Sequence, residues 1–341
     1  KIDLKNKKCL GIIFCSAQLE KFYQELKNFF MQQHKIPTQH IITRNIDNPN
    51  QKIGNSIQFN IIDQINIKMG GKNFFIDFKK EGIIRKGEVF LVIGLDSKYA
   101  NKKVMYSMTS TINPHLNNFV TQEKACNDNT QEKNNTLKKM FEIAIDEINK
   151  RCPHSPDYII IYRQGGNEIH NKILTINELD NFTGILNQYR EKYKDNKNFH
   201  FRNTKLYYIC CNLKSDLKFF ETEKGEVSKA YYNPKSGLIV DDNVTQKNKY
   251  EFYLQPQFVN QGTATPCHYQ IMYYDKSMKE EDELTIENLE KLSFYLSFYY
   301  WTWSGAIRTP SLLKMSNTAM AFYSKILNSN EYCFFEKPTF I

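Results

Sequence analysis

Short apolar runs alternate along the chain with longer segments in which apolar residues recur at helical spacing. The clearest run is residues 158–162 (YIIIY), and the polar sequence RQGGN follows it at residues 163–167. A continuous run of β-branched and aromatic residues predicts a strand that is buried on both faces. Open α/β sheets place their chemistry just beyond the carboxyl ends of such strands, so residues 163–167 are the first candidate site.

The same two patterns recur elsewhere in the chain. Further buried strands are predicted at residues 8–15, 40–43, 88–95, 105–111 and 206–212. Helices are predicted at residues 53–69, 137–151, 176–196 and 286–303, with one more after residue 18 and a final one after Pro310. The polar, Asn-rich segment 114–136 is predicted to be a loop. Strands that alternate with helices in this way favour a mixed α/β sheet.

Composition narrows the class of protein. A chain of 341 residues with 41% apolar residues is long enough for two domains, and its formal charge of +9 fits either general solubility or a polyanionic partner. No apolar run reaches membrane length and no signal peptide is visible, so we expect no membrane partner. The eight cysteines lack metal-site spacing, which indicates buried thiols in a reducing compartment, hence the nucleus or cytoplasm rather than secretion. Because the chain opens without Met, we expect a fragment that lacks its N-terminal part.

Two predicted helices each carry a polar pair at a spacing of four residues. In the first helix the apolar side holds Phe22, Leu26, Phe29 and Phe30, and the other side holds Tyr23 and Lys27. The second helix holds Gln64 and Lys68, and the loop between the two helices holds Gln39. Residues four apart are neighbours on a helix surface. The five polar residues are therefore either parts of two solvated helix faces or the lining of a pocket for one phosphate and one base.

The order of these residues resembles a known family. Tyr23-x-x-x-Lys27, IPTQ ending in Gln39, and QINIKMGG at residues 64–71 are similar to the MID domain of the Argonaute/Piwi family. Two later segments are similar to its PIWI domain: FVNQGTATPCHYQIMYY at residues 258–274 and WSGAIRTPSLLKMSNTAMAF at residues 303–322. Gln rather than Lys at position 64 favours the Piwi branch.

The resemblance implies two domains. Residues 1–78 would be the C-terminal part of a Rossmann-like MID domain, and residues 79–341 an RNase H-like PIWI domain with a mixed sheet. The N and PAZ domains of the family are not represented, and we expect them to precede residue 1.

The resemblance also implies an RNA-binding role for particular residues. A pocket for the 5′ phosphate of a small guide RNA would consist of Tyr23, Lys27, Gln39, Gln64 and Lys68. In the Piwi branch Mg²⁺ often joins this phosphate to the C-terminal carboxylate, which here would be that of Ile341. Contacts to the guide backbone would come from Lys214, Arg308 and Lys314.

Active members of the family cut RNA with two divalent metals about 3.5–4 Å apart, held by Asp, Glu, Asp and then His or Asp. The first Asp corresponds to Asp96, and the Glu, which a mobile loop carries, corresponds to Glu132, with Glu123 as a competitor. The last two positions are occupied by Gln164 and Asn317. An amide brings an oxygen but no charge. We therefore expect a degenerate cleavage site that holds no metal.

His268 and Tyr269 are expected to support the core beside the site and to have no catalytic role. The first functional hypothesis is a guide-RNA-binding protein of the Piwi type that pairs its guide with target RNA, does not cut, and acts with protein partners in a ribonucleoprotein. One alternative is an active guide-directed endonuclease with an altered metal site. The other is an interaction subunit that no longer binds RNA.

Overall fold

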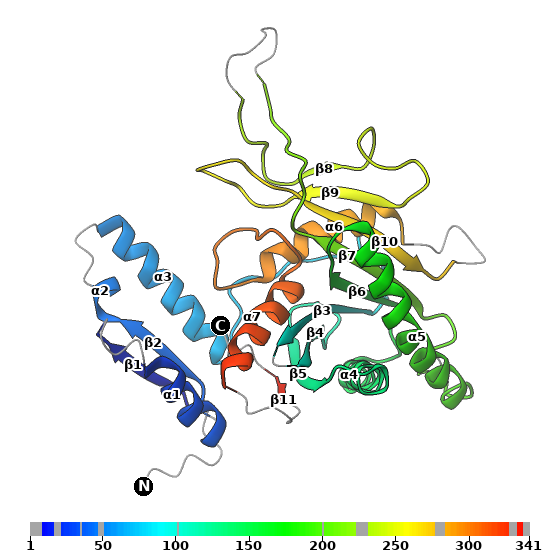
Figure 1. Ribbon diagram of the computed structural model, residues 1–341, viewed down its shortest axis with the longest axis horizontal. Helices are drawn as coiled ribbons and strands as arrows, with labels where there is room; N and C mark the ends of the chain where they lie inside the picture. Colours follow the sequence, from blue (N-terminus) through cyan, green and yellow to red (C-terminus); the bar gives the residue numbers. More distant parts are fainter. Residues whose placement is uncertain are drawn as a thin grey trace.

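The chain forms two sheets that lie side by side (Figure 1). The computed structural model describes residues 9–16, 22–34, 36–46, 51–100, 102–199, 201–222, 231–276, 284–326 and 333–336. Within these residues a two-stranded sheet, β1-β2, accompanies a nine-stranded sheet in the order β11-β5-β4-β3-β6-β7-β10-β9-β8. The large sheet contains parallel and antiparallel pairs, so the predicted mixed α/β class is confirmed.

The smaller sheet and its helices form an N-terminal unit, blue in Figure 1. Its strands pair in parallel. Its elements are β1 (Gly11–Cys15), α1 (Tyr23–Lys27), the π-helix η2 (Asn28–Gln33), β2 (Thr38–Ile42), α2 (Thr43–Ile46) and α3 (Gln51–Lys68). Gly70 has a φ of 90°, a value that glycine adopts readily, and it ends α3 as the sequence indicated.

The buried side of the first helix differs from the prediction. Phe22 and Phe29 are 39% and 47% exposed, whereas Lys27 is 1% exposed. The prediction that Phe22 and Phe29 face the interior was therefore wrong, as was the placement of Lys27 on the outer side. The physical reason is that Lys27 finds a hydrogen-bond acceptor inside the unit, which a phenylalanine cannot use.

The large sheet is built around β3 and β6, which pair in parallel at its centre. On one side of this pair, β3, β4 and β5 form an antiparallel meander and β11 adds to β5; on the other side, β7 runs parallel to β6, and β10, β9 and β8 follow antiparallel. The strands are β3 (Phe90–Ala100), β4 (Lys103–Thr111), β5 (Phe119–Asn127), β6 (Tyr158–Gln164), β7 (Lys205–Asn212), β8 (Leu238–Val240), β9 (Glu251–Gln255), β10 (Cys267–Tyr274) and β11 (Cys333–Phe335).

Helices cover both faces of this sheet. The elements are α4 (Thr130–Asn149), α5 (Glu168–Lys192), α6 (Ile286–Leu296) with the 3-10 turn η4 (Ser297–Tyr299), and α7 (Ser311–Ile326). Along β6, Ile159 and Ile161 pack with residues of α4 and α5, whereas Ile160 and Tyr162 pack with residues of α6 and α7. The strand is therefore buried on both faces, as its composition predicted.

The prediction of a loop at residues 114–136 was wrong. Strand β5 and the first two turns of α4 occupy most of this segment. The polar side chains of β5 misled the interpretation because they are buried in spite of their polarity: Thr121, Gln122 and Glu123 are at most 3% exposed. Gln122 is accommodated by donating from Nε2 to the carbonyl oxygen of Met140, at 3.0 Å.

The two sheets share one core. Met31 and Ile67 of the N-terminal unit belong to the same buried cluster as Leu312 and Phe322 of α7. Phe78, the last residue of the predicted first domain, lies in this cluster too, against the ring of Tyr299. The domain boundary at residue 78 stays a prediction, because the packing is continuous across it.

The cysteines match their predicted role as buried thiols. Seven of the eight are buried, and Cys9 is half-buried. None of the helices in the described residues has the length and apolar character needed to span a membrane.

Candidate functional site

One candidate site is a cluster of polar side chains inside the N-terminal unit. Lys27 of α1 and Lys68 at the end of α3 both donate to the carbonyl oxygen of Thr38, at 2.8 and 3.2 Å. Lys68 also donates to Oε1 of Gln39, at 2.7 Å, and Gln39 donates from Nε2 to Oε1 of Gln64, at 2.9 Å. The structure thus brings four of the five predicted pocket residues into one network.

Tyr23, the fifth predicted residue, borders the same network. The Lys27 ammonium lies 5.6 Å from the centroid of the Tyr23 ring, and that ring packs edge-on against His40 with centroids 4.7 Å apart. The ring is only partly buried. The interpretation of these residues as two solvated helix faces does not fit the burial of Lys27, Gln39 and Lys68, which are 1%, 4% and 3% exposed.

The two lysines carry charge that the described residues do not neutralise. Within those residues, no carboxylate lies at ion-pair distance from either ammonium. Burial lowers the pKa of Lys27 to about 8; burial and the neighbouring Lys27 lower the pKa of Lys68 to about 7. Burial, together with these two lysines, also lowers the pKa of His40 to about 4. A buried cluster of donors without a counter-charge favours an anion. We call these residues (Tyr23, Lys27, Gln39, Gln64 and Lys68) the cation pocket, a name that refers to its two lysine ammonium groups.

The second candidate site is a cleft of about 790 Å³ at the carboxyl ends of β3, β6 and β7, closed on one side by α7. Asp96, Gln164 and Asn317 line it, as predicted for the remnant and substituted cleavage positions. The other lining residues are Ser97, Lys98, Gly165, Gly166, Asn167, His170, Asn212, Leu213, Lys214, Thr309, Leu313, Lys314 and Met320.

Asp96 is fully engaged by donors. Its Oδ1 accepts from the backbone N–H of Ser97 at 2.7 Å, and its Oδ2 accepts from Nδ2 of Asn317 at 3.0 Å. The guanidinium of Arg163 adds an ion pair at 3.7 Å. Asp96 is 4% exposed and Arg163 is 2% exposed, so this arrangement is screened from water.

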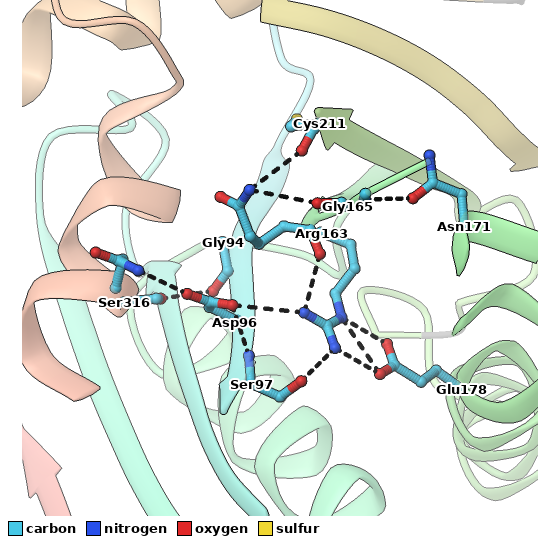
Figure 2. A network of polar contacts seen from close by, with 12 residues as sticks. Gly94, Asp96, Ser97, Arg163, Gly165, Asn171, Glu178, Cys211 and Ser316 are labelled. Carbon is cyan, nitrogen blue, oxygen red and sulfur yellow. Dashed lines mark hydrogen bonds and ion pairs between the residues drawn. The ribbon is translucent and has the colours of Figure 1, made fainter. Parts of the chain in front are cut away.

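Arg163 connects the cleft to the interior (Figure 2). Its Nε donates to Oε2 of Glu178 at 2.9 Å and its Nη2 to Oε1 at 2.9 Å. The hydroxyl of Tyr208 donates to the same carboxylate at 2.7 Å. Figure 2 shows the guanidinium between Asp96 and Ser97 on one side and Glu178 on the other. The single arginine thus neutralises two buried carboxylates in part, and both depend on it.

The two candidates for the second carboxylate lie in different surroundings, and neither lines the cleft. Glu132 stands in the first turn of α4, not on the mobile loop that was predicted, and its carboxylate accepts from the backbone N–H and Nδ2 of Asn127, at 2.9 and 2.8 Å. These hydrogen bonds lower its pKa. Because the N-cap Asn129 accepts from the backbone N–H of Glu132 at 2.8 Å, Glu132 is part of the cap of α4.

Glu123 is the carboxyl group that the sheet places nearer to Asp96. Asp96 pairs with Ser107, and Ser107 pairs with Glu123, so the three residues form a row across β3, β4 and β5. Glu123 is 1% exposed, and burial raises its pKa well above the usual range. Burial disfavours the charged form of this carboxyl group, which makes Glu123 a poor source of the negative charge that a metal needs.

The residues present do not fit a two-metal centre. Two divalent ions need several anionic oxygen ligands, and among the described residues Asp96 is the only carboxylate that lines the cleft. Both of its oxygens already accept hydrogen bonds. The amide of Asn317 turns its NH₂ group, not its oxygen, toward Asp96. In the described part of the chain, no three His, Cys, Asp or Glu side chains gather where they could hold a metal.

Of the three predicted backbone contacts, two line the cleft. Lys214 and Lys314 are exposed and line it. Arg308 donates from Nη2 to the carbonyl oxygen of Leu213, so it supports the turn that carries Lys214. Ile341 lies outside the described residues.

His268 and Tyr269 pack as expected. The Tyr269 ring stacks on Phe252 in the core, with centroids 4.6 Å apart, and His268 stacks on Tyr253 and contacts Glu251 through Nε2 at 3.1 Å. Sequence reasoning missed Lys98, which also lines the cleft. A signal was available, because Lys98 follows Asp96 by two positions on one strand and therefore shares its face.

The sequence matches the Piwi domain family over residues 11–327. "Piwi-like protein 2" of Schmidtea mediterranea is 25% identical over 300 residues, which cover 85% of this chain and 33% of that protein. The structure of Drosophila Piwi superimposes with a TM-score of 0.73 at 19% identity, covering 99% of this chain and 43% of that chain. The structure of Kluyveromyces polysporus Argonaute with a guide RNA gives a TM-score of 0.74 at 16% identity, covering 95% of this chain and 38% of that chain.

The structural likenesses confirm the predicted fold class, an α/β chain with an RNase H-like mixed sheet. The chain spans about one third of the length of the curated relatives that it matches.

Proposed function

The chain belongs to the Piwi domain family, and on this premise we propose that it holds a small guide RNA by its 5′ phosphate and pairs this guide with target RNA. The observation that carries the proposal is the cation pocket. Two buried ammonium groups converge on the Thr38 carbonyl oxygen, and no carboxylate of the described residues pairs with them. A phosphate supplies the charge that this cluster lacks, and Lys27, Lys68 and the amide groups supply its hydrogen bonds.

Tyr23 has the position for a stacking role. Its partly buried ring borders the network through Lys27, and bases of single-stranded RNA commonly stack on such rings. A Mg²⁺ ion that joins the guide phosphate to the Ile341 carboxylate completes this proposal. The described pocket residues offer no carboxylate oxygen for such an ion, so its anionic ligands would be the phosphate and Ile341. Lys214 and Lys314 would contact the RNA backbone at the cleft.

The second part of the proposal is that the protein binds without cutting and acts through partner proteins. Support comes from the engaged state of Asp96 and from the amides at positions 164 and 317. Guide capture needs none of these groups, so it survives the loss of the cleavage chemistry.

A binding assay on the purified protein tests the first part. We expect a 5′-phosphorylated RNA to bind at least tenfold more tightly than the same RNA with a 5′-hydroxyl in fluorescence anisotropy. The double variant Lys27→Met, Lys68→Met should abolish this preference while it keeps the apolar stems of both side chains. Lys197→Ala is the matched control, since this exposed lysine lies beyond the far end of α5. Equal affinity for both RNAs in the wild type would remove the basis of the proposal and favour an interaction subunit that does not bind RNA.

A cleavage assay with the loaded guide, a complementary target, and Mg²⁺ or Mn²⁺ tests the second part. We expect the target to remain intact. Specific cutting opposite the centre of the guide would overturn the non-cleaving assignment and favour the endonuclease alternative.

A further inference from the structure

We propose that the cleft beside Gln164 is a metal-independent phosphodiester site, in which lysine side chains supply the positive charge that metal ions supply in a cutting enzyme. The inference rests on the proposed function, because the strand that the cleft receives would be one of the paired guide–target strands. It concerns how the cleft binds that strand, and Lys98 is a new residue in it.

The first step is the charge of the cleft wall. Three lysines from three separate elements line it: Lys98 on β3, Lys214 just after β7, and Lys314 on α7. All three side chains are exposed. In the part of the chain that the structure describes, none of their ammonium groups has a carboxylate at ion-pair distance. The three charges are therefore available to a ligand.

Among the described residues, Asp96 is the only acidic side chain that lines the cleft. Asp96 is held by Asn317, by the backbone of Ser97 and by Arg163. Its charge is thus offset in part from within the protein, and each of its oxygens accepts a hydrogen bond. A hard cation that entered the cleft would meet three ammonium groups and a single carboxylate that is already paired with Arg163, whereas a phosphodiester would meet attraction.

The third step is the end of α5 that faces the cleft. Two residues at the start of this 25-residue helix line the cleft: the N-cap Asn167 and His170 in the first turn. The N-terminus of a helix carries partial positive charge and favours anions. Glu168 does not oppose this effect, because its carboxylate is paired with Lys172 and Lys249 at 2.9 and 2.7 Å. Together with the three lysines, the helix end adds a separate source of attraction for a phosphodiester.

Two measurable consequences separate this mode of binding from metal-assisted binding. Target affinity should be the same in EDTA as in Mg²⁺, and it should fall as salt rises. For each lost phosphate contact, the ratio of affinities at 50 and 200 mM salt should fall about threefold.

The experiment uses the full chain loaded with a 5′-phosphorylated guide, and it measures the affinity for a complementary, labelled target. In the wild type we expect an affinity in EDTA within twofold of that in Mg²⁺. Lys98→Ala should weaken target binding several-fold. It should also lower the ratio of target affinities at 50 and 200 mM salt about threefold, the change expected for the loss of one phosphate contact. Lys197→Ala removes the same charge at a distant surface and should change neither value by more than twofold.

A double variant puts carboxylates back at the two substituted cleavage positions. Gln164→Asp combined with Asn317→Asp puts two carboxylates beside Asp96. We expect target affinity in EDTA to fall at least tenfold and to recover in part when Mg²⁺ or Mn²⁺ is added. A thermal melt of the same variant with and without Mn²⁺ shows whether the protein is folded and whether it binds the ion.

Failure of this inference is distinguishable from failure of the proposed function. If the wild type does not retain the phosphorylated guide, the proposed function fails. If the guide is retained but target affinity drops more than tenfold in EDTA, or if Lys98→Ala behaves like Lys197→Ala, the metal-independent site is wrong.

Discussion

At the scale of single residues, the most informative groups are the two lysines of the cation pocket. Burial lowers the pKa of Lys27 to about 8, and burial together with the neighbouring charge of Lys27 lowers the pKa of Lys68 to about 7. Such values mean that the empty pocket binds fewer protons near neutral pH than two exposed lysines would. A bound phosphate reverses this effect, because it stabilises both ammonium groups.

The first prediction is a pH dependence of guide capture. Between about pH 6.5 and 9 the affinity for a 5′-phosphorylated RNA should fall as pH rises, by up to about tenfold per pH unit for each lysine that loses its proton. The phosphate itself is mostly doubly charged throughout this range. Anisotropy titrations at four pH values measure the slope, and the 5′-hydroxyl RNA serves as the control. A phosphate preference that stays constant from pH 6.5 to 9 would contradict the coupling.

The free energy of unfolding of the RNA-free protein should change with pH in the opposite direction. The pKa of each lysine is lower in the folded chain than in the unfolded chain, where it is about 10.4. Between pH 7 and 10 the unfolded chain therefore binds more protons, and the free energy of unfolding from these groups rises with pH. Urea melts of the wild type and of Lys68→Met at pH 7 and pH 9.5 test this, and the increase should be smaller in the variant.

The sequence was sufficient to find the pocket residues but not the surroundings of the acidic ones. Tyr23, Lys27 and Lys68 could be found because their spacing and order resemble a known family. By contrast, the assignment of Glu132 to a mobile loop depended on the spacing of one residue in a polar segment. Tertiary packing decides that Glu132 caps a helix and that Glu123 is buried in a sheet. The local sequence around each residue does not predict this.

At the scale of elements, the contact between β3 and α7 determines the shape of the cleft. A Cβ atom at Gly94 would lie 2.4 Å from the backbone carbon of Leu312 and from the backbone nitrogen of Leu313, so only glycine permits this approach. Ser316 fixes the same contact by donating to the Gly94 carbonyl oxygen at 2.8 Å. Because α7 also carries Lys314 and Asn317, its distance from β3 sets their positions.

The prediction that follows concerns Gly94→Ala. The added methyl group must displace α7 backbone, so we expect the free energy of unfolding to fall by about 1–3 kcal/mol or more. Target binding should weaken as well, since Lys314 moves with the helix. Gly184→Ala on α5 is the control: apart from its own helix backbone and chain neighbours, no atom of the described residues lies within 4 Å of the new methyl group. Alanine in a helix should stabilise by up to about 1 kcal/mol. Equal stability of the two variants in urea melts would refute the close contact.

The cap of α4 gives another prediction at this scale. Asn129→Ala removes the acceptor for the backbone N–H of Glu132 and should destabilise the protein by about 1 kcal/mol. Glu132→Gln keeps the shape but removes the charge, and it should lower stability by a smaller amount with no effect on guide binding. A loss of guide or target binding in Glu132→Gln, without loss of stability, would instead place this carboxylate in a functional site.

Two elements were predicted well although their burial differs: the apolar residues of β6 are buried, whereas Phe59 and Ile62 of α3 are 68% and 59% exposed. Strand β6 and the helix at residues 53–69 were predicted within a few residues of their ends. Strand β5 was missed because Thr121, Gln122 and Glu123 are buried, so both of its faces are covered and both carry polar side chains. Gln122 donates to the carbonyl oxygen of Met140 on α4, and the hydroxyl groups of Thr121 and Thr109 share a hydrogen bond. Alternation of apolar and polar residues cannot reveal such a strand.

At the scale of the whole molecule, the cation pocket is coupled to the large sheet. The Lys27 ammonium lies 5.9 Å from the centroid of the Phe322 ring on α7, and Met31 and Ile67 belong to the same core as that ring. Further links join the segment after α3 to the turn after α6: Asn73 donates to the carbonyl oxygen of Trp301 at 3.1 Å, and the backbone N–H of Ile76 donates to the Tyr299 hydroxyl at 3.1 Å. The two units are therefore expected to unfold together.

The last prediction joins this packing to ligand binding. Thermal unfolding of the wild type should be a single transition, and a 5′-phosphorylated RNA at a hundred times its Kd should stabilise the whole chain by about 2.7 kcal/mol. A ligand held by the N-terminal unit raises the stability of the large sheet only if both share one cooperative core. Calorimetry with phosphorylated and hydroxyl RNA measures the shift, and Lys27→Met, Lys68→Met should remove it. Two separate transitions, of which only one moves with the phosphorylated RNA, would show that the shared core does not couple the pocket to the cleft.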